Sequence, residues 1–446
     1  MKTDIRTSKL EQIIDLAKKN GADSTEVIQK SWAENPVSFE NNKLKTLESN
    51  QSIGISIRLI KNNRIGSSSS TDPDALESLV ISAIESSEFG PEATFEFAKE
   101  DLNGRDAVNR VSTETTSLPL ENLVEKGTSV IESLKTFHKD LLVSGGFDLG
   151  FGETIYLNSN SVYGKKVKSI YSTSFSTLLV KDEDFLGIYE GNSSLENFPD
   201  EKEISNKILE KLNYSKENLL LETKKYNIIF TPRAVASIFG EILAVVLNGK
   251  VIQQKISPLA DKLGKELFDK RFSFIEDPGI GIKATPFDDE GIKTTKKTLI
   301  KNGFVNSFYF DLSSASRDAI NHTSTGNGFK GSLSQPPSPN LTSLVIEGGK
   351  IKYNDMINNT KEGILVDQLL GAGQSNTLAG EFNVGIDIGF KIKDGRIQGR
   401  VKNCMIAGNI FQVLKNISEI SKEQEWIYGS MLFPAFLIEN LMVAGK

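Results

Sequence analysis

Glu241 is the first residue whose type and surroundings could do chemistry, because it lies in the apolar segment FGEILAVVLNG at residues 239–249. Burying a glutamate inside an apolar helix is costly, and in helical metalloproteases such a glutamate is the general base beside two zinc-binding histidines. The flanking positions here are Gly240 and Val245, and neither side chain can bind a metal ion. Glu241 is therefore the relic of a metal site, part of a working site of another kind, or a solvated position on the helix surface.

A second group of reactive side chains lies in the segment PFDDEGIKTT, where Asp288, Asp289 and Glu290 precede a glycine. Clustered carboxylates suit hard cations such as Ca²⁺, although the spacing of an EF-hand loop is absent. The same residue types are also typical of an exposed turn. We expect an exposed turn at 286–295, with a cation site as the alternative.

A glycine-rich loop with several hydroxyl groups occupies residues 322–331, HTSTGNGFKG. It lacks the glycine spacing of a P-loop and of a dinucleotide-binding turn, so it predicts a loop rather than a nucleotide site. Because glycine permits close approach of a backbone, this loop and residues 371–373 are candidates to line a substrate site, with ordinary turns as the alternative. The residues that we select as candidate substrate contacts are Thr325, Gly326, Asn327 and Gly328.

Histidine and cysteine are scarce in this chain, which contains only His138, His322 and Cys404. These three residues are widely separated in sequence, so a metal centre built from them is not expected. His322 is a possible acid or base beside the glycine-rich loop, but no Ser-His-Asp arrangement can be placed. Because Cys404 is the single cysteine, an internal disulfide is excluded, and we expect this residue to be an inert thiol in the core. We predict that the purified chain binds no stoichiometric zinc.

The composition describes an ordinary globular protein. Of the 446 residues, 38% are hydrophobic and 25% are charged, and the formal net charge is -6. A negative net charge disfavours nucleic acid as a partner, because affinity for phosphates requires clustered Lys and Arg. We find no apolar stretch long enough for a signal peptide or a membrane span, so we expect a cytoplasmic protein without membrane contact.

The hydrophobic pattern predicts an α+β fold with antiparallel sheets, richest in strands toward the C-terminus. Alternating apolar residues at 53–59 and the turn at 61–64 predict a hairpin between two helices, and Thr231 with Pro232 begins the helix that holds Glu241. The predicted organisation is an N-terminal α+β domain at 1–91, a polar and protease-sensitive linker at 92–118, a central α+β domain at 119–222 and a strand-rich domain at 223–446.

Four ordered segments together resemble the TldD/PmbA family, which is also labelled modulator of DNA gyrase. They are PFDDEGIKTTKKTLIKNG at 286–303, TSTGNG at 323–328, GILVDQLLGAGQSNTLAGEFNVGIDIGFKIKDGRI at 363–397 and CMIAGN at 404–409. With residues 41–69, the resemblance covers nearly the whole chain. It implies peptide processing in the cytosol by a metalloprotease complex of TldD and TldE (PmbA), acting on small unstructured peptides such as antibiotic precursors and antitoxins.

The resemblance also implies a His-Glu-x-x-x-His helix in the catalytic TldD subunits, with a further cysteine ligand near the C-terminus. Aligned on Gly249, this chain has Gly240 and Val245 at the two histidine positions and Glu241 at the glutamate, and residues 426–445 contain no cysteine. The chain therefore resembles the PmbA/TldE side of the family, with a degenerate site. No metal is expected in this chain, and zinc is expected in a TldD-type partner.

Two functions follow from the resemblance. The first is a non-catalytic subunit that completes a substrate chamber, either in a heterodimer with a TldD-type subunit or in a homodimer. There an unstructured peptide could be held by strand addition to an exposed sheet edge. The alternative is an independent metallopeptidase or hydrolase that uses the acidic turn or Glu241 with an unforeseen metal ion.

Overall fold

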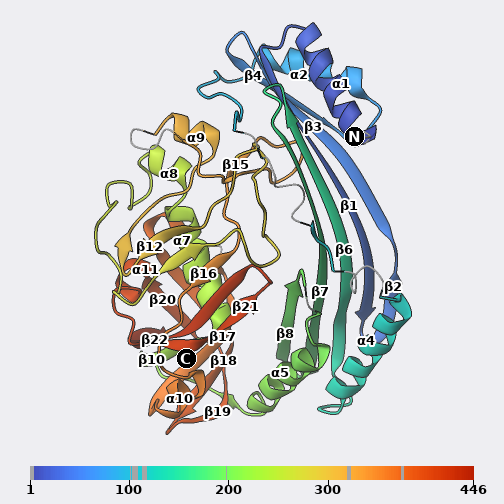
Figure 1. Ribbon diagram of the computed structural model, residues 1–446. Coiled ribbons are helices and arrows are strands. Elements are labelled where there is room, and N and C mark those ends of the chain that lie inside the picture. Colours follow the sequence, from blue (N-terminus) through green and yellow to red (C-terminus); the bar gives the residue numbers. More distant parts are fainter. Residues whose placement is uncertain are drawn as a thin grey trace.

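The structure is a computed structural model that describes residues 5–100, 102, 109–112, 118–196, 198–318, 323–372 and 376–445. Within these ranges the chain forms an eight-stranded sheet, a twelve-stranded sheet and a two-stranded ribbon, with helices on the sheet surfaces (Figure 1). The expected α+β class with a strand-rich C-terminal region is confirmed.

Within its described residues, the N-terminal half builds the eight-stranded sheet and four helices. The strands are β1 (Ser24–Glu40), β2 (Lys43–Leu47), β3 (Asn50–Lys61), β4 (Arg64–Ser70), β5 (Asn109–Arg110), β6 (Leu142–Asn158), β7 (Tyr163–Lys181) and β8 (Asp184–Ser194). The helices are α1 (Ile5–Lys19), α2 (Leu76–Ser87), α4 (Leu120–Lys135) and α5 (Glu201–Tyr214). Strand β1 pairs antiparallel with both β3 and β6, so one sheet runs through the two regions that we predict as separate domains. The boundaries of those domains stay a prediction.

Local sequence explains the hairpin of β3 and β4. Asn62 and Asn63 both have positive φ angles, 51° and 60°, which the two central residues of a type I′ turn require. The alternation that precedes this turn places Ile55, Ile57 and Leu59 on one face, where they are fully buried against α1 and α2. The two predicted helices, α1 and α2, therefore form one layer that packs on the predicted sheet.

The C-terminal half builds the twelve-stranded sheet, and its longest strands are central. The strands are β9 (Asn218–Leu219), β10 (Lys224–Phe230), β11 (Phe274–Glu276), β12 (Lys297–Lys301), β13 (Phe304–Val305), β16 (Leu344–Ile346), β17 (Glu362–Leu370), β18 (Glu381–Lys393), β19 (Arg396–Val401), β20 (Met405–Asn409), β21 (Glu419–Ile427) and β22 (Met431–Ala444), and the separate ribbon is β14 (Gly328–Phe329) with β15 (Ser338–Pro339). The short helices are α6 (Pro232–Val235), α7 (Glu241–Val246), α8 (Gly249–Gln253), α9 (Leu312–Ser316), α10 (Tyr353–Asn358), α11 (Ile410–Val413) and the 3₁₀ turn η3 (Thr377–Ala379).

The helix that holds Glu241 begins as predicted and is then interrupted. The Thr231 side chain accepts a hydrogen bond from the backbone N–H of Ala234, and Pro232 occupies the first turn. Helix α6 continues through a π-helical segment, η1 (Ala236–Gly240), into α7. Phe239 in η1 contacts the rings of Phe230, Phe382 and Phe436, so this segment is held in the largest hydrophobic core.

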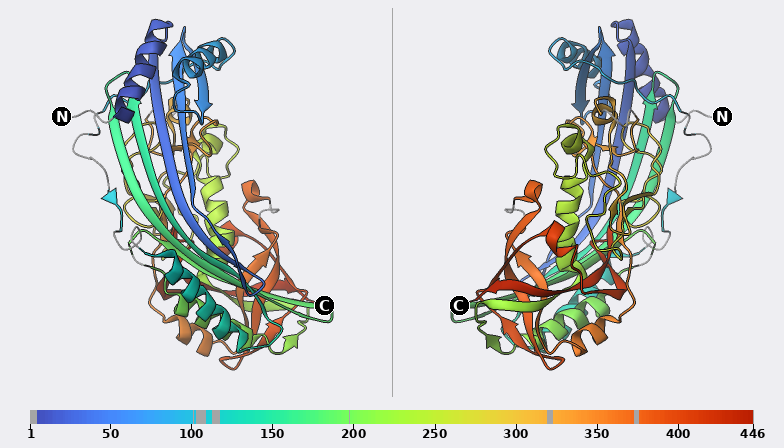
Figure 2. Two further views of the ribbon diagram at one scale, coloured as in Figure 1. Left: turned by 90° about the vertical axis from the view of Figure 1, so that its right-hand side faces the viewer. Right: turned by 90° about the vertical axis from the view of Figure 1, so that its left-hand side faces the viewer.

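The long strands of the N-terminal sheet curve along one side of the C-terminal half (Figures 1 and 2). At the lower end in Figure 1, α5 lies between the two sheets, and one hydrophobic cluster combines residues of α4, α5, β7, β17 and β18. The ring of Tyr214 packs on Phe390 across this contact, with 5.4 Å between ring centroids. The two halves therefore share buried apolar surface.

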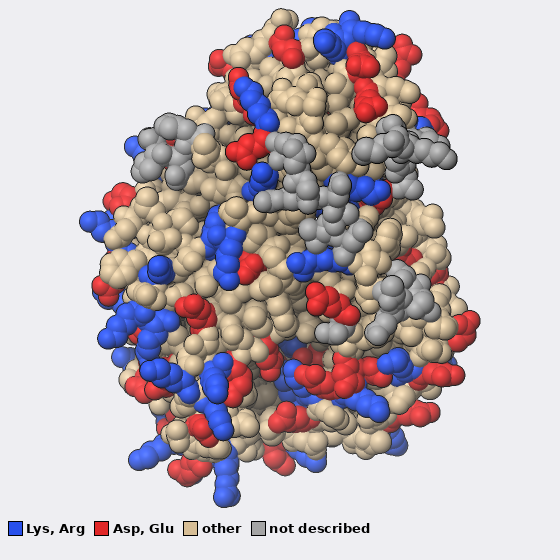
Figure 3. Space-filling model, viewed as in Figure 1, with Lys and Arg blue, Asp and Glu red and all other residues tan. Residues whose placement is uncertain are grey.

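The face shown in Figure 3 carries basic and acidic side chains interspersed with one another. This distribution differs from the stripe of one sign that is typical of a nucleic-acid-binding face.

No helix among the described residues is long and apolar enough to span a membrane.

Candidate functional site

The acidic turn is buried, so the expectation of an exposed turn is wrong. Asp288, Asp289 and Glu290 are 0%, 3% and 0% exposed. Asp288 accepts hydrogen bonds from the backbone N–H groups of Glu290, Ile292 and Gly328 at 3.0, 2.9 and 2.8 Å. Burial and the neighbouring Glu290 carboxylate raise the pKa of Asp288 well above its usual range. The turn residues thus hold their own loop together, which the residue types alone do not reveal.

The other two carboxylates of the turn bind cations from the N-terminal sheet. Asp289 Oδ2 accepts a hydrogen bond from Lys30 Nζ at 2.7 Å. Burial alone would raise the pKa of Asp289, but the charges of Lys30 and Lys166 outweigh it and lower this pKa. Glu290 Oε1 accepts a hydrogen bond from Arg58 Nη2 at 2.9 Å. We refer to Asp288, Asp289 and Glu290 as the clasp, because Asp289 and Glu290 join the two halves of the chain.

The Arg58 guanidinium is shared between two buried carboxylates. Its Nε donates to Glu26 Oε1 at 2.7 Å, while Glu26 Oε2 accepts a hydrogen bond from the Tyr156 hydroxyl at 3.0 Å. Burial, with Asp311 and Glu26 nearby, raises the pKa of Glu290 to about 7. Breaking a buried ion pair from one side is strongly destabilising, so these contacts fix how the sheet sits on the C-terminal half.

The glycine-rich loop packs directly against the clasp, which brings two separately predicted motifs together. A Cβ atom at Gly328 would overlap the Glu290 carboxylate, and one at Gly326, whose φ is +73°, would overlap the Lys293 carbonyl. Asp289 N–H donates to the Gly328 carbonyl at 2.9 Å. The glycines are therefore required by close packing and by a left-handed backbone conformation.

The polar residues of the same loop are engaged inside the protein. Asn327 is fully buried, and its Nδ2 donates to Glu276 Oε1 and to the Asn340 carbonyl, each at 2.8 Å. The Thr325 hydroxyl donates to Asn327 Oδ1 at 2.7 Å. The proposal that Thr325, Gly326, Asn327 and Gly328 contact a substrate stays a prediction. The loop has a visible structural role, which is to position the next two residues, Phe329 and Lys330.

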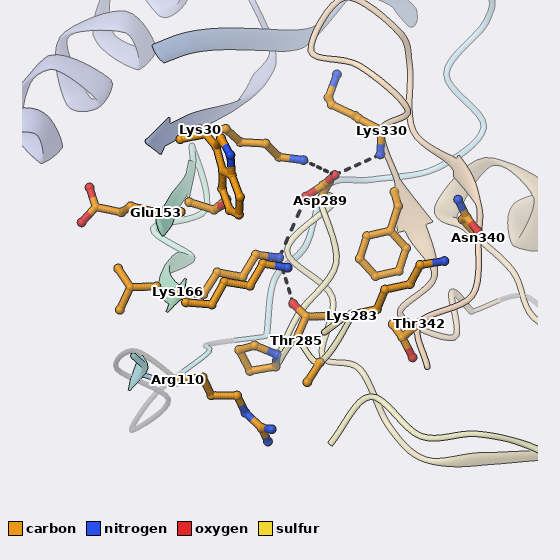
Figure 4. A pocket seen from close by; sticks show the side chains of 18 of the residues that line it. Lys30, Arg110, Glu153, Lys166, Lys283, Thr285, Asp289, Lys330, Asn340 and Thr342 are labelled. Carbon is orange, nitrogen blue, oxygen red and sulfur yellow. Dashed lines mark hydrogen bonds and ion pairs between the residues drawn. The ribbon is translucent and has the colours of Figure 1, made fainter. Parts of the chain in front are cut away.

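Phe329 and Lys330 line a cavity of about 420 Å³ between the N-terminal sheet and the C-terminal half (Figure 4). We call it the cationic cavity, because six of its lining residues are Lys or Arg and two are acidic. The six basic residues are Lys30, Arg110, Lys166, Lys168, Lys283 and Lys330. Sequence reasoning missed this site, since its basic residues come from segments far apart in the chain and only the tertiary fold gathers them.

Strand register explains how the cavity wall is formed. Lys30 on β1 lies opposite Thr154 on β6, which lies opposite Lys166 on β7. Two residues away on each strand, the next row on the same face consists of Trp32 on β1, Gly152 on β6 and Lys168 on β7. The sheet thus presents two lysines of β7 and one of β1 to the clasp.

Glycine in β6 makes room for the tryptophan of that row. A Cβ atom at Gly152 would lie 2.5 Å from Cε3 of the Trp32 indole, and one at Gly150 would also overlap the ring. The indole therefore lies over the β6 backbone, and its Nε1 donates to Glu34 Oε2 at 3.0 Å. Trp32 gives the cavity an aromatic surface beside its lysines.

Lys166 and Lys168 of β7 are half-buried, and the carboxylate near Lys166 is that of Asp289. Lys166 Nζ donates to Thr285 Oγ1 at 2.9 Å and to the Phe287 carbonyl at 3.0 Å, and it lies 4.0 Å from Asp289 Oδ1. Burial, together with the charges of Lys30 and Lys168, lowers the pKa of Lys166 to about 8. The pKa of Lys168 is also lowered, first by burial and then by the charge of Lys30.

The remaining charged groups reinforce this positive character. Lys330 Nζ donates to Ser56 Oγ at 3.1 Å, and burial lowers its pKa to about 8. Arg110 donates to the Gly279 carbonyl. Glu153 pairs with Lys165 at 2.7 Å, and its carboxylate points away from the other labelled side chains in Figure 4.

The segment at the predicted metal position does not fit zinc. Gly240 has no side chain, and a Cβ atom there would lie 3.0 Å from Cε2 of the Phe433 ring and 3.8 Å from Met431 Sδ. Glu241 is exposed, as the alternative of a solvated surface position expects. Val245 is half-buried and carries no donor atom. An imidazole at position 240 would have to displace Phe433.

The two histidines and the cysteine, from which we expect no metal centre, are considered next. His138 follows α4, and its Nδ1 accepts a hydrogen bond from the backbone N–H of Asp140 at 3.2 Å. Cys404 is buried in the C-terminal core, as expected, and burial raises its pKa to about 11. His322 and Gly373 lie outside the described residues. Within the described ranges, no three His, Cys, Asp or Glu side chains are grouped to hold a metal ion.

Comparison with known proteins identifies two domains of one family. Residues 223–445, half of the chain, match the PmbA/TldA metallopeptidase C-terminal domain, and residues 26–87 match PmbA/TldA metallopeptidase domain 1. The crystal structure of TldE from Thermococcus kodakarensis superposes with a TM-score of 0.90 at 25% identity, covering 98% of this chain and 100% of that one.

The curated relatives point in the same direction. Metalloprotease PmbA of Escherichia coli O157:H7 is 24% identical over 438 residues, which cover 95% of this chain and 93% of that protein. A metalloprotease TldD homologue of Haemophilus influenzae is 25% identical over 185 residues, covering 41% of this chain and 38% of that protein. From these matches and the shared fold, the chain belongs to the PmbA/TldD metallopeptidase family.

Proposed function

We propose that this chain is a PmbA/TldE-type subunit that binds a TldD-type metallopeptidase, completes its substrate chamber and does not itself cleave peptides. One observation carries this proposal. The helical segment α6–η1–α7 keeps a fixed place in the core, yet Gly240 lies beneath Phe433 and Val245 has no ligating atom. A general base needs a bound water to activate, and Glu241 has no metal ligand beside it in this segment.

The contacts of the clasp disfavour the alternative of an independent enzyme that uses the acidic turn. Asp288 is occupied by three backbone N–H groups, Asp289 by Lys30, and Glu290 by Arg58. A cation that took these oxygens would have to displace Lys30 and the buried Arg58, and unpairing the buried arginine would cost several kcal/mol. This leaves Glu241 as the candidate that an independent activity would have to use.

An exposed apolar surface on the N-terminal sheet supports association with a partner. Leu142 lies opposite Leu178, and Val180 lies opposite Phe185, and all four side chains are exposed. Leu179, which lies between Leu178 and Val180 in the sequence, is buried on the other face of the sheet. We call these four residues the outer apolar patch. Clustered exposed apolar residues are typical of protein interaction sites, for either a TldD-type subunit or a second copy of this chain.

The substrates in this proposal are small unstructured peptides, and the place of action is the cytoplasm. The support is the family itself, since the relatives are named metalloproteases. Zinc would be bound by the TldD-type partner, which would supply the activated water for peptide hydrolysis. The role of this chain would be to shape the chamber and hold part of the peptide.

Co-expression with a TldD-type subunit tests this function. We expect the two chains to co-purify, the mixture to cleave unstructured peptides, and this chain alone to be inactive and free of stoichiometric zinc. Phe185→Ser should weaken association, whereas Leu220→Ser, at an equally exposed leucine outside the outer apolar patch, should not. Cleavage by this chain alone at the rate of the mixture, abolished by Glu241→Gln, would overturn the proposal and restore Glu241 as a catalytic base.

A further inference from the structure

The cationic cavity holds more positive charge than its described surroundings neutralise. Asp289 is the one acidic lining residue whose carboxylate lies among the labelled lysines in Figure 4. It already accepts hydrogen bonds from Lys30 Nζ and from the backbone of Lys330. A cleft lined mostly by one sign of charge concentrates ligands of the opposite sign, so this cavity favours an anion.

Two lysines are left to meet such an anion. Lys168 Nζ donates to the Ile282 carbonyl at 3.0 Å and forms no ion pair with a described carboxylate. Lys283 is exposed at the cavity rim, without a carboxylate partner among the described residues. Lys166 and Lys283 are both labelled among the residues that line the cavity in Figure 4. An oxyanion bound at the ammonium group of Lys168 or Lys283 would accept a charge-assisted hydrogen bond that no described carboxylate already accepts.

Six uncharged lining residues are apolar, which restricts the kind of anion. The apolar lining residues are Trp32, Val167, Ala284, Pro286, Phe329 and Leu341. A small inorganic anion would satisfy the lysines but would leave this surface in contact with water. A ligand that carries an apolar group next to its oxyanion would cover both parts.

We propose that the cationic cavity binds the C-terminal carboxylate of a peptide whose last side chain is apolar. The carboxylate accepts a charge-assisted hydrogen bond from Lys168 or Lys283, and the last side chain packs on the Trp32 indole. The choice of a peptide rests on the proposed function, whereas the carboxylate and its apolar neighbour follow from the cavity. The cavity thus holds the product-like end of an unstructured peptide while the rest extends toward a partner.

The test measures binding to the full chain alone by fluorescence anisotropy. The probe is the hexapeptide Gly-Ser-Gly-Ser-Ala-Phe with fluorescein at its N-terminus and a free C-terminal carboxylate. We expect saturable binding at pH 7 and low salt, weakened about tenfold or more when the same peptide is amidated, because one charge-assisted contact is lost. An amidated peptide with glutamate in place of its second serine separates a terminal carboxylate from a side-chain carboxylate, and it should bind as weakly as the amide.

Variants place the binding in the cavity. Lys283→Gln should weaken binding of the free-carboxylate peptide severalfold, and Lys168→Gln with Lys283→Gln about tenfold or more. Lys283 is exposed, so its replacement leaves the fold intact. Lys301→Gln is the matched control, since Lys301 is an exposed lysine of β12 outside the cavity, and it should leave binding unchanged.

Three results would overturn this assignment. They are equal binding of the free and amidated peptides, unchanged binding in the Lys168 and Lys283 double variant, and displacement of the probe by millimolar inorganic phosphate but not by unlabelled free-carboxylate peptide. None of them depends on a partner subunit. If the chain forms an active complex with a TldD-type subunit but fails this test, only the carboxylate site is refuted. If the chain binds the peptide but forms no complex with a TldD-type subunit, only the proposed function is refuted.

Discussion

Replacing Arg58 with methionine tests whether the clasp holds the two halves of the chain together. Arg58 is 5% exposed and forms ion pairs with Glu26 at 2.7 Å and with Glu290 at 2.9 Å, both of which are also buried. Methionine keeps much of the packing against the rings of Phe95 and Phe97 but removes the only cation between these carboxylates that the structure describes. Leaving buried charge unpaired costs about 3–5 kcal/mol.

The assay is urea unfolding of the variant and of two controls at pH 7.5. Arg64→Met removes an exposed arginine that donates one hydrogen bond to the Gly90 carbonyl, and it should cost less than about 1 kcal/mol. Adding Glu290→Gln to Arg58→Met should recover about 1–3 kcal/mol, because an uncharged amide replaces a stranded carboxylate.

The loss caused by Arg58→Met should also depend on pH. Without the arginine, the folded-state pKa of Glu290 rises further above its unfolded value. A carboxyl group with a raised folded-state pKa binds more protons when folded, so its contribution to stability falls as pH rises from the unfolded pKa through the folded one. The variant should therefore lose less stability at pH 5 than at pH 8. A loss below about 1 kcal/mol at both pH values would refute the account of the clasp.

Three further predictions concern the other parts of the molecule. The double variant Gly240→His and Val245→His should not create a zinc site. It should lower the free energy of unfolding by about 1–3 kcal/mol, because the side chain at position 240 displaces Phe433. Zinc analysis and urea unfolding check this, and one tightly held zinc per chain would contradict it. Binding of the free-carboxylate peptide should weaken severalfold between pH 7 and 9, because Lys166 and Lys330 lose their protons near their pKa values of about 8. The charged groups around these two lysines are Glu26, Lys30, Arg58, Lys168, Asp288 and Asp289. Anisotropy measures this, and binding that strengthens with pH would count against it. Limited proteolysis should cut first within 92–118, and first cuts within 226–330 would argue against that linker.

Much of the fold follows from local patterns in the sequence. The hairpin at Asn62 and Asn63 and the helix start at Thr231 and Pro232 depend on turn and cap chemistry that acts within a few residues. The buried thiol of Cys404 follows from its apolar neighbours. These features need no knowledge of distant contacts.

The clasp and the cationic cavity depend on contacts that the sequence does not display. The residues around Asp289 in the chain indicate a solvated side chain, because its partners, Lys30 and Lys166, belong to strands more than 120 residues earlier in the chain. The lysines of β7 are spaced as on any exposed strand, and only the register with β1 and β6 turns them toward the clasp. Cross-strand pairing and long-range ion pairs therefore decide the site, whereas local propensity decides the elements.

The central claim is that this chain contributes shape, but no catalytic group, to a complex with a TldD-type subunit. The most direct measurement is peptide hydrolysis by the reconstituted complex in two forms, one with Glu241→Gln in this chain and one with the motif glutamate of the partner subunit changed to glutamine. The account predicts an unchanged rate for the first complex and no activity for the second. Loss of activity with Glu241→Gln in a complex that still assembles would contradict it.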